Sequence, residues 1–168
     1  MTSMSRLSLR RTWLRLGAAA GIIGLAGFTS WAGGHQHAYY LSINWTDSLP
    51  NWAFLVVRGT EPRRGDLIEF IPPENAFYQD VAFVKRVVAV PGDKVACHGR
   101  QFLIDGMVVA TAKQTSQSGV PLERGPCGVV PDGHVFVLTP HPDGFDSRYK
   151  EIGYVALNRV RGVAHPIL

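Results

Sequence analysis

The first 46 residues lack any acidic side chain, and residues 16–34 lack charge of either sign. The positive charges that precede this apolar run are Arg6, Arg10, Arg11 and Arg15. About 20 apolar residues span a bilayer as a helix, and flanking cationic residues stay on its cytoplasmic side. We therefore expect residues 1–34 to form an inner-membrane signal anchor or transmembrane helix, with residues 35–168 forming a domain in the periplasm.

Small residues at the end of the apolar run leave a second interpretation open. Ser30 and Ala32 form a small-x-small pattern before Gly33, which is typical of a cleaved signal peptide that releases a periplasmic protein. The Arg10-Arg11 pair also resembles a twin-arginine signal, although the topological role of positive charge explains it. Because the run is longer than a typical signal-peptide core, it favours the anchor.

The rest of the chain lacks a basic cluster. It carries 13 basic and 13 acidic residues, so the net charge of +4 comes from the N-terminal arginines. A protein that binds nucleic acid needs positive charge on its folded surface, so we expect no nucleic-acid partner. A length of 168 residues with a 46% hydrophobic fraction fits one folded domain plus an appendage.

This domain also lacks any sustained helical period in its sequence. Short β-branched and aromatic runs alternate with turn signals such as Pro91-Gly92 and Asp105-Gly106. The strands that we expect cover residues 39–45, 52–57, 67–71, 81–90, 94–97, 101–104, 107–110, 134–138 and 154–161. We therefore predict an all-β body in which residues 113–128 form a long polar loop.

Cysteine is scarce, with only Cys97 and Cys127 in the chain. Outside the cytoplasm the two would be oxidised to a disulfide that attaches the polar loop to the sheet. The alternative is a zinc site that adds His98 and His134, but it lacks the close C-x-x-C pairs of structural zinc sites. We predict the disulfide, no metal and no cofactor.

One lysine lies alone in an apolar strand. Side chains alternate between the two faces of a strand, so Lys85 shares its face with Phe83, Val87 and Ala89. Burial disfavours the ammonium form and lowers the pKa of a lysine, and an amine that is neutral near pH 7 can act as a general base. The alternative is a lysine whose stem packs while its amine stays in water.

The sequence lacks a histidine beside a nucleophile motif such as Gly-x-Ser-x-Gly. Ser48 lies at a bend, because Pro50 restricts Leu49 to extended conformations. Taken alone, it is an ordinary turn serine. A neutral lysine can activate a serine in place of histidine, however, so Ser48 and Lys85 are candidates for a catalytic pair.

Three blocks of sequence follow one another at a characteristic spacing. They are TDSLP at residues 46–50, VKRVVAVPGDKV at residues 84–95, and DSR at residues 146–148 followed by Gly153. These blocks resemble the nucleophile box, the lysine box and the D-S-R box of the S26 signal peptidase family. The chain is most similar to the conjugative-transfer branch of that family, the TraF-type peptidases.

The resemblance implies a membrane-anchored serine endopeptidase with a Ser/Lys dyad on a signal-peptidase-like β-barrel or sandwich. Ser48 would be the nucleophile and Lys85 the general base. The Ser48 N–H and the Thr46 hydroxyl would form the oxyanion hole. The residues that would support the site are Asp146, Ser147, Arg148, Gly92 and Asp93.

The resemblance also implies a secreted protein substrate with small residues before the cleaved bond. In the TraF branch this substrate is a pilin precursor of a conjugation apparatus, and an amine that resolves the acyl-enzyme would close the pilin into a ring. Three alternatives remain. They are a general signal peptidase I, an inactive periplasmic scaffold protein of the same fold, and a zinc-stabilised binding module.

Two departures from the family pattern bear on specificity. Trp52 follows Pro50 closely, where TraF-like boxes continue with glycine, and we expect it to reshape the substrate cleft. The D-S-R box normally continues Y-F-G-P, but this chain inserts Lys150-Glu151 and lacks the proline. The resemblance therefore indicates the type of reaction more strongly than the choice of substrate.

Overall fold

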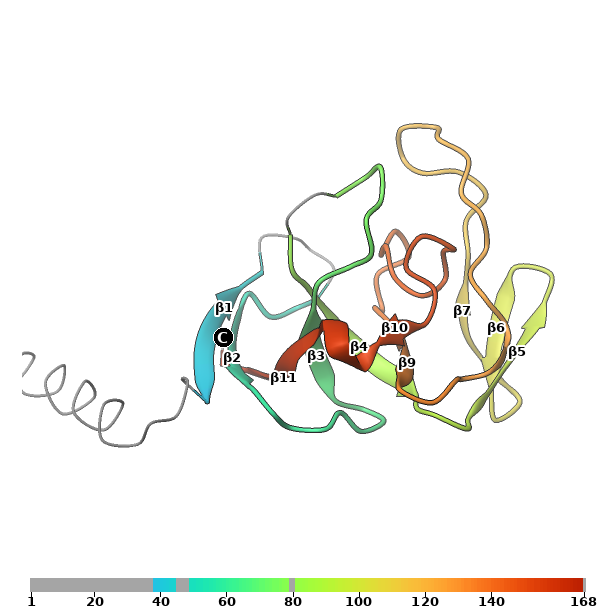
Figure 1. The fold of residues 1–168 in the computed structure, drawn as a ribbon. Coiled ribbons are helices and arrows are strands. Elements are labelled where there is room, and N and C mark those ends of the chain that lie inside the picture. The colour runs from blue at the N-terminus through green and yellow to red at the C-terminus, as the bar shows by residue number, and fades with distance from the viewer. Residues whose placement is uncertain (1–37, 45–48, 79–80, 168) are drawn as a thin grey trace, which may run out of the picture. The chain divides into compact units, whose positions relative to one another are not determined.

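The computed structural model describes residues 38–44, 49–78 and 81–167. Its strands lie in the compact unit Tyr39–Leu168 and form two antiparallel sheets (Figure 1). The all-β prediction is therefore confirmed for these residues. The predicted N-terminal helix lies outside them, and its boundary near residue 34 stays a prediction. Within the described ranges, no helix is long and apolar enough to cross a membrane.

The larger sheet has seven strands in the order β1-β2-β11-β3-β4-β9-β10. Their bounds are β1 (Tyr39–Ile43), β2 (Ala53–Val57), β3 (Leu67–Phe70), β4 (Phe83–Ala89), β9 (His134–Leu138), β10 (Val155–Ala156) and β11 (Val160–Pro166). The strand that carries Lys85, β4, lies between β3 and β9 and is therefore an interior strand of the sheet.

The smaller sheet has the order β7-β6-β5-β8. Its strands are β5 (Lys94–His98), β6 (Gln101–Ile104), β7 (Met107–Thr111) and β8 (Gly128–Val129). Asp105 and Gly106 both have positive φ, so the β6–β7 hairpin has the two-residue turn that the Asp-Gly pair predicts. The predicted polar loop is present, except that Gly128 belongs to β8.

The last predicted strand, residues 154–161, is wrong in its extent. The chain forms β10, then a 3₁₀ turn, η1 (Leu157–Arg159), and then β11. β10 pairs with β9 at one end of the sheet, whereas β11 pairs with β2 and β3. The chain must therefore cross the sheet between two short strands, and no glycine or proline marks this crossing in the sequence.

The larger sheet is rolled. Two strands, β2 and β11, separate β1 from β3, so a flat sheet would hold β1 and β3 about 14 Å apart. Nevertheless, the side chains of Tyr40 and Ser42 on β1 hydrogen-bond Glu69 on β3. The apolar residues that cluster with Tyr40 are Leu49, Phe54, Val56, Leu67, Val84 and Ala164. Rolling thus brings the edge strand toward the middle of the sheet.

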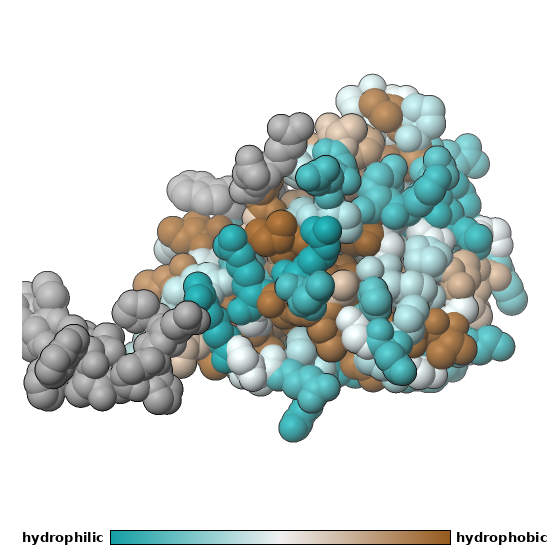
Figure 2. Space-filling view, viewed as in Figure 1, coloured by the Kyte–Doolittle hydropathy of each residue, from teal (hydrophilic) through white to brown (hydrophobic). Residues whose placement is uncertain are grey.

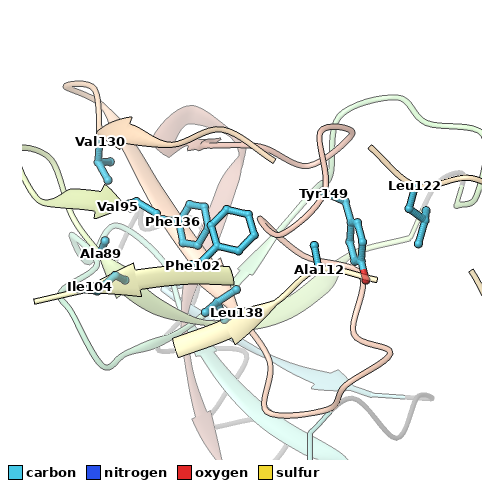
Figure 3. Close-up of a cluster of buried hydrophobic side chains, with 10 residues drawn as sticks. All are labelled: Ala89, Val95, Phe102, Ile104, Ala112, Leu122, Val130, Phe136, Leu138 and Tyr149. Carbon is cyan, nitrogen blue, oxygen red and sulfur yellow. The ribbon is translucent and has the colours of Figure 1, made fainter. Parts of the chain in front are cut away.

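A second apolar cluster joins the two sheets. Phe102 of β6 and Phe136 of β9 lie side by side at its centre, with ring centroids 5.5 Å apart (Figure 3). Tyr149, Ala112 and Leu122 form a separate group toward one side of the same view. The apolar cluster therefore extends to residues of the long polar loop.

The Pro91-Gly92 turn carries the chain from the larger sheet to the smaller one. Gly92 has φ of +86°, which favours glycine, and its N–H donates to the Val130 carbonyl at 3.0 Å. The Asp93 carboxylate accepts from the Val90 N–H at 2.8 Å and pairs with Arg64 at 2.8 Å. This placement supports the interpretation that Gly92 and Asp93 shape the turn.

The predicted disulfide is confirmed. Cys97 on β5 is bonded to Cys127, which directly precedes β8, and 30 positions separate the two residues. Because both sulfurs belong to this bond, the alternative zinc site that needed two thiolates is wrong. The bond closes a loop of residues 112–127, called the 112–127 loop below, against the smaller sheet.

Removing the disulfide should destabilise the domain. Loop closure over 30 residues predicts that Cys97→Ser/Cys127→Ser loses about 3 to 4 kcal/mol of unfolding free energy. Urea denaturation of the oxidised chain and of the double variant measures this difference. Treating the wild-type chain with a reductant should reproduce the loss, and an unchanged urea midpoint would contradict the expectation.

Candidate active site

Lys85 lies in a cleft of about 910 Å³, called the lysine cleft below. Four segments line it: the end of β1 with Asn44, residues 77–78 and 81–85 around the start of β4, part of the 112–127 loop, and residues 141–145. These segments are far apart in sequence, and the rolled sheet and the disulfide-closed loop bring them together. The cleft therefore exists only in the folded chain.

The Lys85 side chain is buried, with 5% of its surface exposed. In the pairing of β4 with β3, Lys85 lies opposite Ile68. Its amine lies 5.1 Å from the centroid of the Phe83 ring. The predicted apolar face holds as far as Val87. A bulge then shifts the register, and Ala89 joins the cluster between the two sheets.

Burial lowers the pKa of Lys85 from its ordinary value of 10.5 to about 8. The negative charge of Asp146 opposes this shift, and the positive charge of Arg148 adds to it. No hydrogen bond or ion pair joins the Lys85 amine to any residue that the structure describes. The amine can therefore lose its proton near neutral pH and accept one from a neighbouring donor.

Asp146 and Arg148 form a buried ion pair, with exposed fractions of 0% and 3%. Arg148 Nε donates to Asp146 Oδ1 and Nη2 donates to Oδ2, each at 2.8 Å. The Thr139 N–H also donates to this carboxylate at 2.8 Å. A bidentate pair with further backbone bonds is a firm structural unit, unlike an exposed pair that contributes little.

The same guanidinium organises one wall of the cleft. Arg148 donates to the carbonyls of His141 and Gly144, both at 2.9 Å. A Cβ atom on Gly144 would lie 1.9 Å from Thr139 Oγ1, so this close approach requires glycine. Residues 139–148 are thereby wrapped around the Asp146–Arg148 pair beside Lys85.

Ser147 attaches this wall to β9. Its N–H donates to the Val137 carbonyl at 3.1 Å, and its hydroxyl accepts from the Val137 N–H at 2.9 Å. Because β9 is the neighbour of β4, these bonds fix the D-S-R segment relative to the lysine strand. The structure thus places Ser147 where it supports the D-S-R segment.

The predicted nucleophile Ser48 and the predicted oxyanion donor Thr46 lie outside the described residues. The chain on either side of them is described. Asn44 lines the lysine cleft, and its N–H donates to the Trp52 carbonyl at 2.7 Å. Leu49 is buried in the same apolar cluster as Val84, the neighbour of Lys85. The residue before the segment that contains Ser48 therefore lines the cleft, and the residue after it belongs to the apolar cluster of a neighbour of Lys85.

The 112–127 loop, gold to orange in Figure 1, supplies the polar wall of the cleft. Lys113 at its start forms an ion pair with Asp143 in the opposite wall. The Lys113 ammonium and the Gln117 side chain hold the pKa of Asp143 below its usual range. Arg100 donates to the carbonyls of Ala112 and Leu122, both at 2.9 Å, and so closes the base of the loop.

The inserted residues after the D-S-R box have a structural role. The Lys150 N–H donates to the Glu123 carbonyl at 3.1 Å, and its amine pairs with the Glu123 carboxylate at 2.7 Å. The insertion therefore fastens the returning arm of the 112–127 loop beside the site. Trp52 does not line the cleft and is 54% exposed, so the expectation that it reshapes the cleft is not supported.

Sequence reasoning missed one charged residue near the site. Glu69 on β3 is only 3% exposed and accepts the hydroxyls of Tyr40 and Ser42. A lone carboxylate in the run LIEF is the same kind of signal that drew attention to Lys85. The described residues contain no group of three or more His, Cys, Asp or Glu side chains that could hold a metal ion.

Residues 10–168 match the family described as signal peptidase, peptidase S26, and the chain belongs to that family. It is 28% identical to "Conjugal transfer protein TraF" of Agrobacterium fabrum, over 94% of this chain and 96% of that protein. It is 27% identical to "Probable conjugal transfer protein TraF" of Sinorhizobium fredii, over 90% of this chain and 84% of that protein.

Two further similarities involve proteins named signal peptidase I. The protein from Leptolyngbya laminosa is 33% identical over 61% of this chain and 51% of its own length. A crystal structure of a signal peptidase I from Enterococcus faecalis is 28% identical and covers 62% of this chain and 97% of that one, with a TM-score of 0.42. The predicted resemblance to the S26 family and its TraF-type members is thus confirmed.

Replacing Lys85 by an apolar side chain should stabilise the fold. A fall in pKa from 10.5 to about 8 corresponds to roughly 3 kcal/mol for holding the charged amine in its buried site. Below pH 8 this cost is fully present, and it fades as pH rises toward 10.5, because the unfolded chain then binds more protons than the folded one. Lys85→Met should therefore raise the unfolding free energy at pH 7.

Urea denaturation at pH 7 measures this gain. The matched control is Lys150→Met, which removes an exposed amine paired with Glu123 and should bring no gain. A lower unfolding free energy for Lys85→Met would mean that the lysine stabilises the fold, contrary to the expectation.

Proposed function

We propose that this chain is a membrane-anchored serine endopeptidase with a Ser48/Lys85 dyad, and that it processes a secreted precursor. The observation that carries the proposal is the buried Lys85 amine, whose pKa is lowered to about 8 in a cleft that Asn44, shortly before Ser48, also lines. Membership of the S26 peptidase family gives the reaction type, which is cleavage of a peptide bond in a protein substrate.

The chemistry follows from these groups. Ser48 Oγ attacks the scissile carbonyl carbon while its proton passes to the neutral Lys85 amine. The Ser48 N–H and the Thr46 hydroxyl stabilise the oxyanion. The C–N bond then breaks, and the leaving amine takes the proton from Lys85, which leaves an acyl-enzyme. Water or an amine attacks this ester and gives its proton to Lys85, and Lys85 returns that proton to Ser48 Oγ as the ester bond breaks.

The cleft suits an extended peptide with two different edges. One wall is apolar and includes Phe77, Tyr78, Phe83 and Val84. The facing wall offers the polar side chains of residues 115–118 in the 112–127 loop. Two relatives carry names that place them in conjugal transfer, which supports a pilin precursor as the substrate. An amine that resolves the acyl-enzyme would then produce a cyclic pilin.

Attachment to the inner membrane with a periplasmic catalytic domain is part of this proposal. The outer face of β1 exposes Tyr39, Leu41 and Ile43 by 65%, 72% and 51%. Hydrophobic atoms gather at this end of the molecule (Figure 2). β1 begins five residues after the uncharged run of residues 16–34. An exposed apolar face next to an anchor segment fits a domain that works close to a bilayer.

A general signal peptidase I is the second candidate, because the chain shares 33% identity with a protein of that name. The two candidates share the dyad and differ in substrate range. An inactive scaffold of the same fold has less support, because it gives no reason to retain a buried amine that has no ion-pair partner among the described residues.

Loss of either member of the dyad should abolish cleavage. Ser48→Ala and Lys85→Met should each lower the cleavage rate by about a thousandfold or more, because the two groups act as a unit. The assay uses the full chain in detergent with membrane precursors that carry small residues before the cleaved bond, and it reads product mass. A product one water lighter than the linear fragment identifies a ring.

Thr60→Ala is the matched control, because this exposed hydroxyl does not line the cleft and has no place in the proposed chemistry. It should retain cleavage. Cleavage that persists in both Ser48→Ala and Lys85→Met would overturn the dyad. A wild-type chain that cleaves no precursor would favour the scaffold.

The pH dependence of cleavage should follow the deprotonation of the Lys85 amine. Only the neutral amine accepts the serine proton, so kcat/KM should rise with pH through about 8 and level off above it. Initial rates at low substrate from about pH 6 to pH 10 give this profile. A rate that keeps rising to pH 10 without levelling off would contradict a base whose pKa is lowered to about 8.

A further inference from the structure

Glu69 is a carboxylate enclosed by the rolled sheet. It lies on β3 with 3% of its surface exposed, and its nearest cationic atom is Arg161 Nη1 at 4.0 Å. Its two oxygens accept the hydroxyls of Tyr40 and Ser42, which are two positions apart on β1. Burial and the bond to Glu69 raise the pKa of Tyr40, so this hydroxyl keeps its proton.

An apolar side chain would fit this place at lower cost. The cluster around Tyr40 consists of aliphatic and aromatic residues, and a buried carboxylate loses hydration that its hydrogen bonds must replace. Replacing a buried charge by an apolar residue of similar volume is often neutral or stabilising. Glu69 is therefore better explained by a role in specifying one arrangement of the strands than by a contribution to stability.

The sequence of β1 leaves its pairing register with β2 open to a shift of one residue. The strand reads YYLSI; Tyr40 and Ser42 face inward, while Leu41 and Ile43 are exposed. The outward set is thus more apolar than the inward set. A shift of one residue in the pairing with β2 would exchange the two faces of the strand. Hydrophobic burial alone favours that exchange.

The two hydroxyls oppose the exchange. In the observed register they satisfy both oxygens of Glu69, and a shift that replaces Tyr40 and Ser42 by Leu41 and Ile43 would place aliphatic side chains against the carboxylate. A buried carboxylate without partners is strongly unfavourable. Glu69 thereby selects one register for an edge strand whose apolar pattern would select the other.

The register of β1 matters because the strand leads into the site. Ser42, Ile43 and Asn44 line the lysine cleft, and residues 45–48 follow directly. A shift of one residue moves the chain by about 3.3 Å along the strand. A displacement of about 1 Å at a reacting group can cost about a hundredfold in rate.

We infer that Glu69 is a positioning residue that fixes the register of β1 through Tyr40 and Ser42, and so presents the Ser48 segment to Lys85. This role rests on the Ser48/Lys85 mechanism proposed above. Glu69 itself does not touch the substrate. Its effect passes through the strand, so it should change the turnover rate and leave the proton affinity of Lys85 as it is.

The decisive variant is Glu69→Leu, which removes the carboxylate and keeps its approximate volume. It should unfold at the same urea concentration as the wild-type chain or at a higher one, while kcat falls by about tenfold to a hundredfold. The rise of kcat/KM with pH should stay centred near 8. A residue with a merely structural role would not separate stability from turnover in this way.

The complementary variant is Tyr40→Phe/Ser42→Ala, which leaves the buried carboxylate without its two donors. It should lose both stability and turnover, and adding Glu69→Leu should restore the stability but not the turnover. Tyr154→Phe is the matched control, because the Tyr154 hydroxyl is buried without a hydrogen-bond partner in the described structure. It should leave turnover unchanged and should not lower the unfolding free energy, because it removes a buried hydroxyl that has no partner among the described residues.

Amide hydrogen exchange of residues 39–44 tests the register without a substrate. Exchange there should increase in Glu69→Leu, while β5 and β6 stay protected. Unchanged exchange in this segment would overturn the positioning role. Faster exchange with full turnover would overturn it equally, because the register would then not matter for catalysis.

The Ser48→Ala variant separates this inference from the proposed function. If Ser48→Ala is inactive and Glu69→Leu retains full kcat, the dyad stands and the positioning role fails. If Ser48→Ala cleaves at the wild-type rate, the proposed function fails, and the catalytic part of the inference fails with it.

Discussion

The burial of the Lys85 amine is the constraint on which the rest of the structure depends. An ammonium group surrounded by protein is unfavourable unless it is paired, and here it has no ion-pair partner among the described residues. An interior strand, the Phe83 ring and the loop around Asp146 enclose it. The fold holds the amine in surroundings that disfavour its charged form, and this burial lowers its pKa to about 8.

The described residues contain four buried charged side chains, and their pairing divides them by role. Asp146 and Arg148 satisfy each other and hold the wall of the cleft. Glu69 is satisfied by two hydroxyls and holds the edge strand. Among the described residues, Lys85 has neither an ion-pair partner nor a hydrogen-bond partner. The other three buried charges are thus satisfied by their surroundings, whereas Lys85 responds to burial by a lowered pKa.

The walls of the cleft come from segments that differ in polarity. The disulfide and Arg100 hold the 112–127 loop to the smaller sheet, and Lys150 joins it to the segment after the D-S-R box through Glu123. The loop adds a polar wall to a site whose other wall is apolar. The two walls thus come from separate elements. Lys85 lies on an interior strand of the larger sheet, whereas the polar wall belongs to a loop that is closed by one covalent bond.

The sequence by itself determined the all-β class, most strand positions, the disulfide, the isolated lysine and the family, because these depend on local pattern, on turn chemistry and on motif spacing. Only the tertiary structure decided that β10 and β11 are separate strands and that Asp146 and Arg148 are buried together. It also decided that Glu69 meets Tyr40 and Ser42. Such contacts join residues that rolling of the sheet brings together, and no local period encodes how far a sheet rolls.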